Sequence, residues 1–141
     1  MNYLKILFLV NTILIINNSL QAKNNFLNEG KILFENEKYS EAKFKFEKEI
    51  VFNPKSELAY LYLSEIFKSL EKTDLQEQNL NTVILLNPKN EEAIFNLSTL
   101  RLKESDYDES KKLINKLLSF CKNYCQKSKK LKIEIENSLK K

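Results

Sequence analysis

The sequence predicts an all-α protein, an α-solenoid of about three helix-turn-helix repeats closed by a C-terminal capping helix. Its 141 residues include one glycine, Gly30, and two prolines, Pro54 and Pro88, whereas tight hairpins and phosphate-binding loops need several glycines. The tripeptide Asn-Pro-Lys occurs at 53–55 and again at 87–89, a spacing of 34 residues. Apolar residues recur at three- and four-residue steps around these tripeptides, as on amphipathic helices.

Residues 1–22 have the layout of a secretory signal, with Lys5, an apolar core over 6–16 and a polar segment ending at Ala22. We expect cleavage after Ala22, because the apolar core is shorter than the roughly 20 residues that span a membrane. The alternatives are an uncleaved anchor or a buried helix. In either membrane arrangement, Lys5 would keep the N-terminus cytoplasmic. The sequence therefore predicts an exported protein, periplasmic or secreted, or else anchored in the inner membrane and facing the periplasm.

The first repeat is predicted over 23–56. Two helical patterns meet at Glu37-Lys38-Tyr39, and the second contains Ala42, Phe46 and Ile50 at four-residue steps. This segment resembles the tetratricopeptide family, whose pattern places large, small and aromatic residues and a closing proline where the sequence has Phe26, Gly30, Tyr39, Ala42, Phe46 and Pro54. The resemblance implies that Gly30 and Ala42 face each other where the two helices approach most closely.

The second and third repeats are predicted over 57–90 and 91–124. The second lacks the turn aromatic, since Thr73 takes its place, and the third lacks the closing proline. The residues expected to pack these two repeats are Tyr60, Ser64, Pro88, Ser98 and Tyr107.

The segment 125–141 is predicted to be a basic capping helix with one apolar stripe, Leu131, Ile135 and Leu139. Residues 122–141 contain 7 Lys against 2 Glu, a net charge of 7 − 2 = +5. A basic surface for anionic lipid or nucleic acid is the alternative. The stretch lacks the interleaved aromatic residues that favour nucleic acid, so we expect no nucleic-acid partner.

The family resemblance implies that the first helices of successive repeats line a concave groove. It nominates nine partner-binding residues: Leu27, Lys31, Phe34, Leu61, Glu65, Lys68, Phe95, Thr99 and Leu102. This mixture of apolar and charged side chains suits a peptide or helix better than a small polar substrate. The lysine and asparagine set with which some relatives hold a C-terminal carboxylate is not matched, because Leu27 stands where a cation is needed. Alternatively, Phe34, Phe95 and Leu102 are core or rim residues.

The two cysteines, Cys121 and Cys125, are expected to form a disulfide, because an even pair in an exported protein is normally bridged. Two free buried thiols are the alternative. Two sulfurs alone cannot make a zinc site, and the spacing is not that of a redox-active pair.

Catalysis is not expected. The chain has no His, which removes Ser-His-Asp and Cys-His chemistry and every His-ligated metal site. Acidic residues such as Glu91 and Glu92 lie where predicted helices begin, and the helix dipole favours negative charge there. We therefore expect no enzyme, cofactor or metal. The sequence favours an adaptor or scaffold that binds a protein or peptide in the bacterial cell envelope, or an inner-membrane-anchored accessory subunit of an envelope assembly.

Overall fold

The computed structural model describes residues 25–140. The predicted signal segment, 1–22, lies outside the described residues. Among the residues that the structure describes, no helix is long and apolar enough to cross a membrane.

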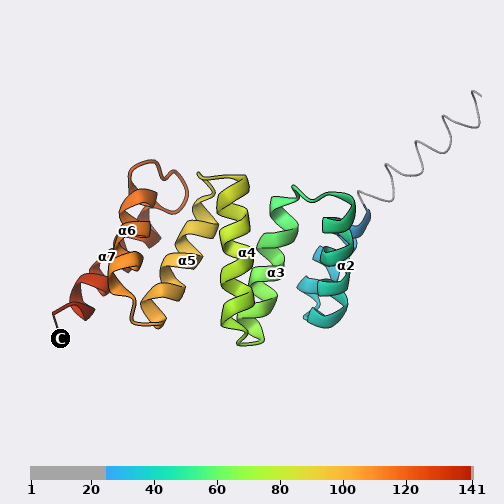
Figure 1. Ribbon diagram of the computed structural model, residues 1–141, viewed down its shortest axis with the longest axis horizontal. Coiled ribbons are helices and arrows are strands. Elements are labelled where there is room, and N and C mark those ends of the chain that lie inside the picture. Colours follow the sequence, from blue (N-terminus) through green and yellow to red (C-terminus); the bar gives the residue numbers. More distant parts are fainter. Residues whose placement is uncertain (1–24, 141) are drawn as a thin grey trace, which may run out of the picture. The chain divides into compact units, whose positions relative to one another are not determined.

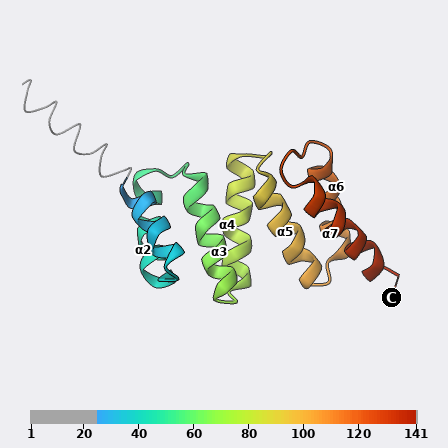
Figure 2. The same cartoon turned by 180° about the vertical axis from the view of Figure 1, so that it is seen from behind.

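The described residues are helical throughout and contain no strand, which confirms the predicted all-α repeat fold (Figures 1 and 2). A helix over 25–35 is followed by α2 (Tyr39–Phe52), α3 (Glu57–Ser69), α4 (Thr73–Leu86), α5 (Glu91–Lys103), α6 (Tyr107–Leu118) and α7 (Cys125–Ser138). The chain divides into two compact units, Met1–Ala59 (unit 1) and Tyr60–Lys141 (unit 2), with the boundary inside α3.

The three turns within the helix pairs share one backbone conformation. Glu37, Glu71 and Ser105 have positive φ angles of 59°, 56° and 63°, and they lie 34 residues apart. In each turn the next N–H donates to a carbonyl five residues earlier, as in Lys72 to Phe67 at 2.8 Å. This left-handed cap closes the first helix of each pair and satisfies its last carbonyl groups. The 34-residue period is therefore present in the backbone as well as in the prolines.

Pro54 and Pro88 end the second helices without packing against them. Both prolines are exposed, and the preceding residues, Asn53 and Asn87, have φ angles of −135° and −139°. A proline disfavours the helical conformation of the residue before it. The prediction that Pro54 and Pro88 pack the repeats is therefore wrong. Their effect is to end each helix by restricting the backbone of the preceding asparagine.

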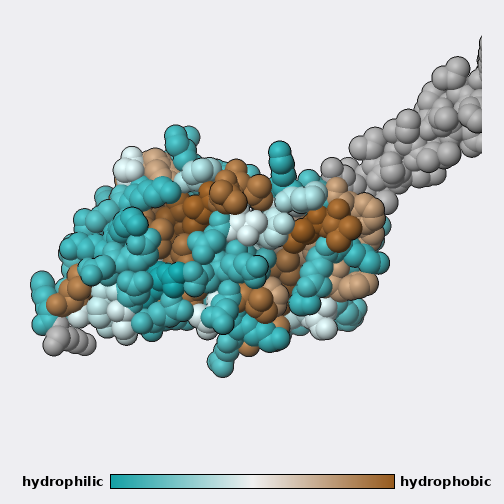
Figure 3. All heavy atoms as spheres, viewed as in Figure 1, coloured by the Kyte–Doolittle hydropathy of each residue, from teal (hydrophilic) through white to brown (hydrophobic). Residues whose placement is uncertain are grey.

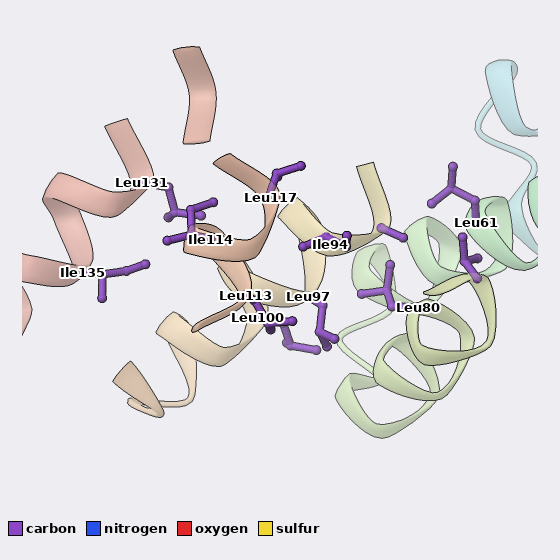
Figure 4. Close-up of a cluster of buried hydrophobic side chains, with 12 residues drawn as sticks. Leu61, Leu80, Ile94, Leu97, Leu100, Leu113, Ile114, Leu117, Leu131 and Ile135 are labelled. Atoms are coloured by element: carbon purple, nitrogen blue, oxygen red, sulfur yellow. The ribbon is translucent and has the colours of Figure 1, made fainter. Parts of the chain in front are cut away.

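Unit 2 is organised around α5, which packs against α4, α6 and α7. Figure 4 shows the apolar side chains that these helices bury together with Leu61 of α3: Leu61, Leu80, Val83, Ala93, Ile94, Leu97, Leu100, Leu113, Ile114, Leu117, Leu131 and Ile135. Tyr60 and Tyr107 are half-buried against the same cluster.

Two fully buried serines join α5 to α6. The Ser98 hydroxyl donates to the Ser110 carbonyl at 2.9 Å, and the Ser110 hydroxyl donates to the Ser98 carbonyl at 2.8 Å. Small side chains let the two helices approach, and each hydroxyl is satisfied although it is buried. In α3, the buried Ser64 hydroxyl donates to the Leu61 carbonyl at 2.6 Å.

In unit 1, Gly30 packs against an aromatic ring. A Cβ atom at Gly30 would lie 2.7, 2.9 and 3.0 Å from three ring atoms of Phe46. Ala42 is the expected partner of Gly30; the three atoms nearest to such a Cβ all belong to Phe46, one helical turn after Ala42. Ala42 and Phe46 are both fully buried, while Phe26 is half-buried and stacks on Phe52 with ring centroids 5.6 Å apart.

Helix α7 covers α6 with Leu131 and Ile135, which are buried. Leu139, the third residue of the predicted stripe, is 44% exposed and directly follows Ser138, the last residue of the helix. The end of unit 2 formed by α6 and α7 is largely hydrophilic on the face seen in Figure 3.

The corner between α6 and α7 is held by a disulfide and by one carboxylate. Cys121 and Cys125 are bonded, with Cα atoms 5.3 Å apart. Glu91, at the start of α5, accepts hydrogen bonds from the backbone N–H groups of Lys122, Asn123 and Tyr124 at 2.8, 2.9 and 2.8 Å. The bond from Tyr124 is the largest cause that lowers the pKa of Glu91. These contacts give Tyr124 a defined place beside α5.

We predict that Gly30→Ala destabilises the protein. The new methyl group would force the buried Phe46 ring to move, at a cost of about 1–3 kcal/mol, which exceeds the roughly 1 kcal/mol that alanine gains in helix propensity. Urea unfolding measures the difference in free energy. Asn28→Ala, at an exposed site of the same helix, is the control and should be neutral or stabilising. A Gly30→Ala variant as stable as this control would contradict the close contact.

We predict that Ser105→Gly raises the free energy of unfolding by about 1 kcal/mol, because glycine adopts a φ of 63° without the penalty of a Cβ atom. Ser119→Gly is the matched control, since Ser119 has a φ of −71° and no such strain to relieve. Thermal melts of both variants should shift in opposite directions. Shifts of the same sign would argue against a strained turn.

Candidate functional site

Unit 2 carries a pocket of about 330 Å³ beside α5. It is formed by the end of α3, the turn into α4, the first turn of α4 and one face of α5. The lining residues are Lys68, Glu71, Thr73, Gln76, Phe95, Asn96, Thr99, Leu100, Lys103 and Glu104. The wall thus combines an aromatic ring, amide and hydroxyl groups and charges of both signs.

Three predicted partner-binding residues, Lys68, Phe95 and Thr99, line this pocket. Glu65, one turn before Lys68 on α3, lies next to it. One Glu65 oxygen accepts a hydrogen bond from the Asn96 amide at 2.8 Å, and the other forms an ion pair with Lys68 at 3.2 Å. The structure therefore brings four of the predicted residues together.

Two predicted residues of unit 2 lie elsewhere. Leu61 is 7% exposed and belongs to the hydrophobic core (Figure 4), so its prediction as a partner-binding residue is wrong. Leu102 is half-buried, packs against the same core and does not line the pocket. Both were nominated from the family resemblance, which does not say which side chains of a helix this chain buries against the next hairpin.

The three predicted residues of unit 1, Leu27, Lys31 and Phe34, are half-buried on the helix over 25–35. The Phe34 ring packs on Tyr39, with ring centroids 5.6 Å apart and an interplanar angle of 57°. Their use in partner binding stays a prediction for unit 1.

Several pocket residues were missed. Asn96 and Lys103 lie on the α5 face that carries Phe95 and Thr99, at steps of three and four residues from Thr99. Extending that helical spacing would have found them. Glu71 and Thr73 belong to the turn between α3 and α4, and no periodic pattern points to turn residues.

Beside the pocket, four side chains form what we call the acidic–aromatic cluster: Glu65 from α3, Glu92 and Phe95 from α5, and Tyr124 before α7. The Phe95 and Tyr124 rings lie 5.4 Å apart between centroids, at an angle of 51°. The Lys127 ammonium lies 4.9 Å from the centroid of the Tyr124 ring. Phe95 belongs to both the pocket and the cluster, so the two form one continuous surface.

Negative charge is crowded and partly desolvated in this cluster. Burial is the main cause that raises the pKa of Glu92, and the Glu65 carboxylate raises it further. Burial and the same two carboxylates raise the pKa of Tyr124, whose side chain is hydrogen-bonded to Glu92. Lys127 and Lys68 act in the opposite direction and lower the pKa of Glu92. Their effect is too small to restore its ordinary value.

Within residues 25–140, no three His, Cys, Asp or Glu side chains are grouped as they would be around a metal ion. Two acidic residues at helix starts have structural partners. Glu91 holds the α6–α7 corner, and the Asp106 carboxylate accepts the Glu109 N–H at 3.2 Å as a helix cap.

No protein-family model matches the sequence, and no curated protein matches it by sequence. Solved structures do match. The first TPR domain of Spaghetti (RPAP3), bound to the HSP90 peptide SRMEEVD, has a TM-score of 0.76 at 20% identity, over 86% of this chain and 98% of that one.

Two further structures have a TM-score of 0.75 at 13% identity. The TPR2B domain of yeast Sti1, in a complex with pHsp70, matches over 83% of this chain and 98% of that domain. PilF of Pseudomonas aeruginosa matches over 87% of this chain, which spans 56% of the PilF chain. At these identities the similarity shows the fold alone: this chain is an all-α helical repeat solenoid, and the RPAP3 and Sti1 structures that it resembles are TPR domains.

Proposed function

We propose that this chain is a non-catalytic adaptor that binds a protein or peptide segment along the pocket-lining face of its repeats. The main observation behind the proposal is the pocket of unit 2. Its wall combines an aromatic side chain, Phe95, with the amide side chains of Gln76 and Asn96. Amide side chains can hydrogen-bond an extended backbone, and a half-buried ring offers the kind of anchor that dominates interface energies. The RPAP3 and Sti1 domains were solved with Hsp-derived ligands, which supports the same use of this fold.

We further propose that the protein works in the bacterial cell envelope. The support is the signal-like layout of residues 1–22. The competing proposal is an accessory subunit that keeps this segment as an inner-membrane anchor, although the apolar run over 6–16 is short for a spanning helix. In both cases the repeats face the periplasm.

Partner binding predicts specific crosslinks in cells. A photo-crosslinking amino acid at position 95 or 34 should capture one defined protein, whereas the same group at Leu85, an 81% exposed residue of α4, should capture background only. The variant Phe34→Ala with Phe95→Ala should weaken binding of that protein by about tenfold or more, because aromatic anchors carry much of an interface's energy. Circular dichroism must show unchanged helicity. Equal binding by the folded double variant would contradict the proposal.

Export predicts a processed chain. Intact mass spectrometry of the protein from its native cells should show an N-terminus at Lys23, in a periplasmic or extracellular fraction. A chain that begins at Met1 in the membrane fraction would favour the anchored subunit. A full-length chain in the cytoplasm would overturn the envelope proposal.

A further inference from the structure

We propose that the acidic–aromatic cluster of Glu65, Glu92, Phe95 and Tyr124 binds a cationic side chain, lysine or arginine, of the peptide segment that occupies the neighbouring pocket. The inference rests on the proposed function and adds to it the chemistry of the partner. It makes this surface selective for a basic segment.

The first argument is the geometry of the cluster. Two carboxylates come from α3 and α5, and two rings lie 5.4 Å apart between centroids. A cation beside carboxylates and over aromatic rings gains both Coulomb and cation–π energy. The pocket begins at Phe95, and the Asn96 amide joins its wall to Glu65 at 2.8 Å. A peptide in the pocket would therefore place a neighbouring side chain on the cluster.

The second argument is that two lysines of the protein itself, Lys127 and Lys68, already contact the cluster through weak interactions. Lys127 lies over the Tyr124 ring at 4.9 Å, which shows that this ring accepts an ammonium group. Lys68 pairs with Glu65 at 3.2 Å, and its side chain is 44% exposed. Exposed pairs of this kind contribute little to stability, so a ligand cation could replace either lysine at small cost.

The third argument is electrostatic strain. The pKa of Glu92 is raised by burial and by Glu65, even with Lys68 and Lys127 nearby and a hydrogen bond to Tyr124. The folded state therefore disfavours the charged form of Glu92, and a bound cation would relieve this. The peptide SRMEEVD bound by the RPAP3 domain is acidic at its end. Such an end would meet two carboxylates here, and like charges across an interface are unfavourable.

A peptide-display selection on the full chain tests the proposal. Random nine-residue peptides selected on the wild-type chain should be enriched in lysine or arginine at one position. In fluorescence anisotropy, a selected peptide should bind Glu92→Gln about tenfold more weakly, and Lys127→Gln about two- to threefold more tightly, because its own competing cation is gone. Glu109→Gln, on α6 and away from the pocket lining, is the matched control and should bind as wild type.

Two further measurements separate binding from folding. Replacing the basic residue of the peptide by norleucine should weaken its binding to wild type and leave its binding to Glu92→Gln nearly unchanged. Glu92→Gln should be at least as stable as wild type at pH 7. A raised native pKa means that the native state loses stability as pH rises above the ordinary value of 4.5, and glutamine removes that loss.

The outcomes distinguish the two proposals. Selected peptides that bind with no basic preference, or with acidic residues at the key position, overturn the cationic site and leave the peptide-binding adaptor standing. A tighter complex with Glu92→Gln than with wild type would also overturn the cationic site. If no peptide is selected and the crosslink at position 95 captures no defined protein, both proposals fail.

Discussion

The close approach of paired helices is the constraint on which the rest of this structure depends. In unit 2, Ser98 and Ser110 bond to each other's backbone at 2.9 and 2.8 Å, so α5 and α6 can meet only with small residues at that place. In unit 1, Gly30 leaves room for the Phe46 ring. Each pair buries its apolar face only against its neighbours. In unit 2, α5 faces α6 with Ser98 and faces the pocket with Phe95 and Thr99.

The turns show how the repeat is maintained where the sequence has diverged. Glu37, Glu71 and Ser105 share the left-handed conformation although none of them is glycine. The common backbone is enforced by the helices on either side and by the hydrogen bond that each turn makes to the preceding helix. Repeat identity is thus conserved in geometry more strictly than in residue type.

The fold could be predicted because its signals are local. The 34 residues from Pro54 to Pro88 span a single helical hairpin, and Gly30 indicates a close contact inside another hairpin. The site could be predicted only in part. The family resemblance nominated Phe95 and Thr99, which line the pocket, but it also nominated Leu61, which lies in the core because of its packing against the next hairpin. The position of Tyr124 in the site could not be predicted, because it depends on hydrogen bonds between Glu91 and backbone N–H groups 31–33 residues later in the sequence.

The three hydrogen bonds between Glu91 and the N–H groups at 122–124 limit where a further helical hairpin could be inserted. A further hairpin inserted before Glu57 would leave α3, α5 and Tyr124 in contact, and the acidic–aromatic cluster would survive. A hairpin inserted between α6 and α7 would carry Tyr124 away from Phe95 and leave the Glu91 carboxylate without its three donors. The last hairpin and its cap therefore form one unit that tolerates added repeats only on its N-terminal side.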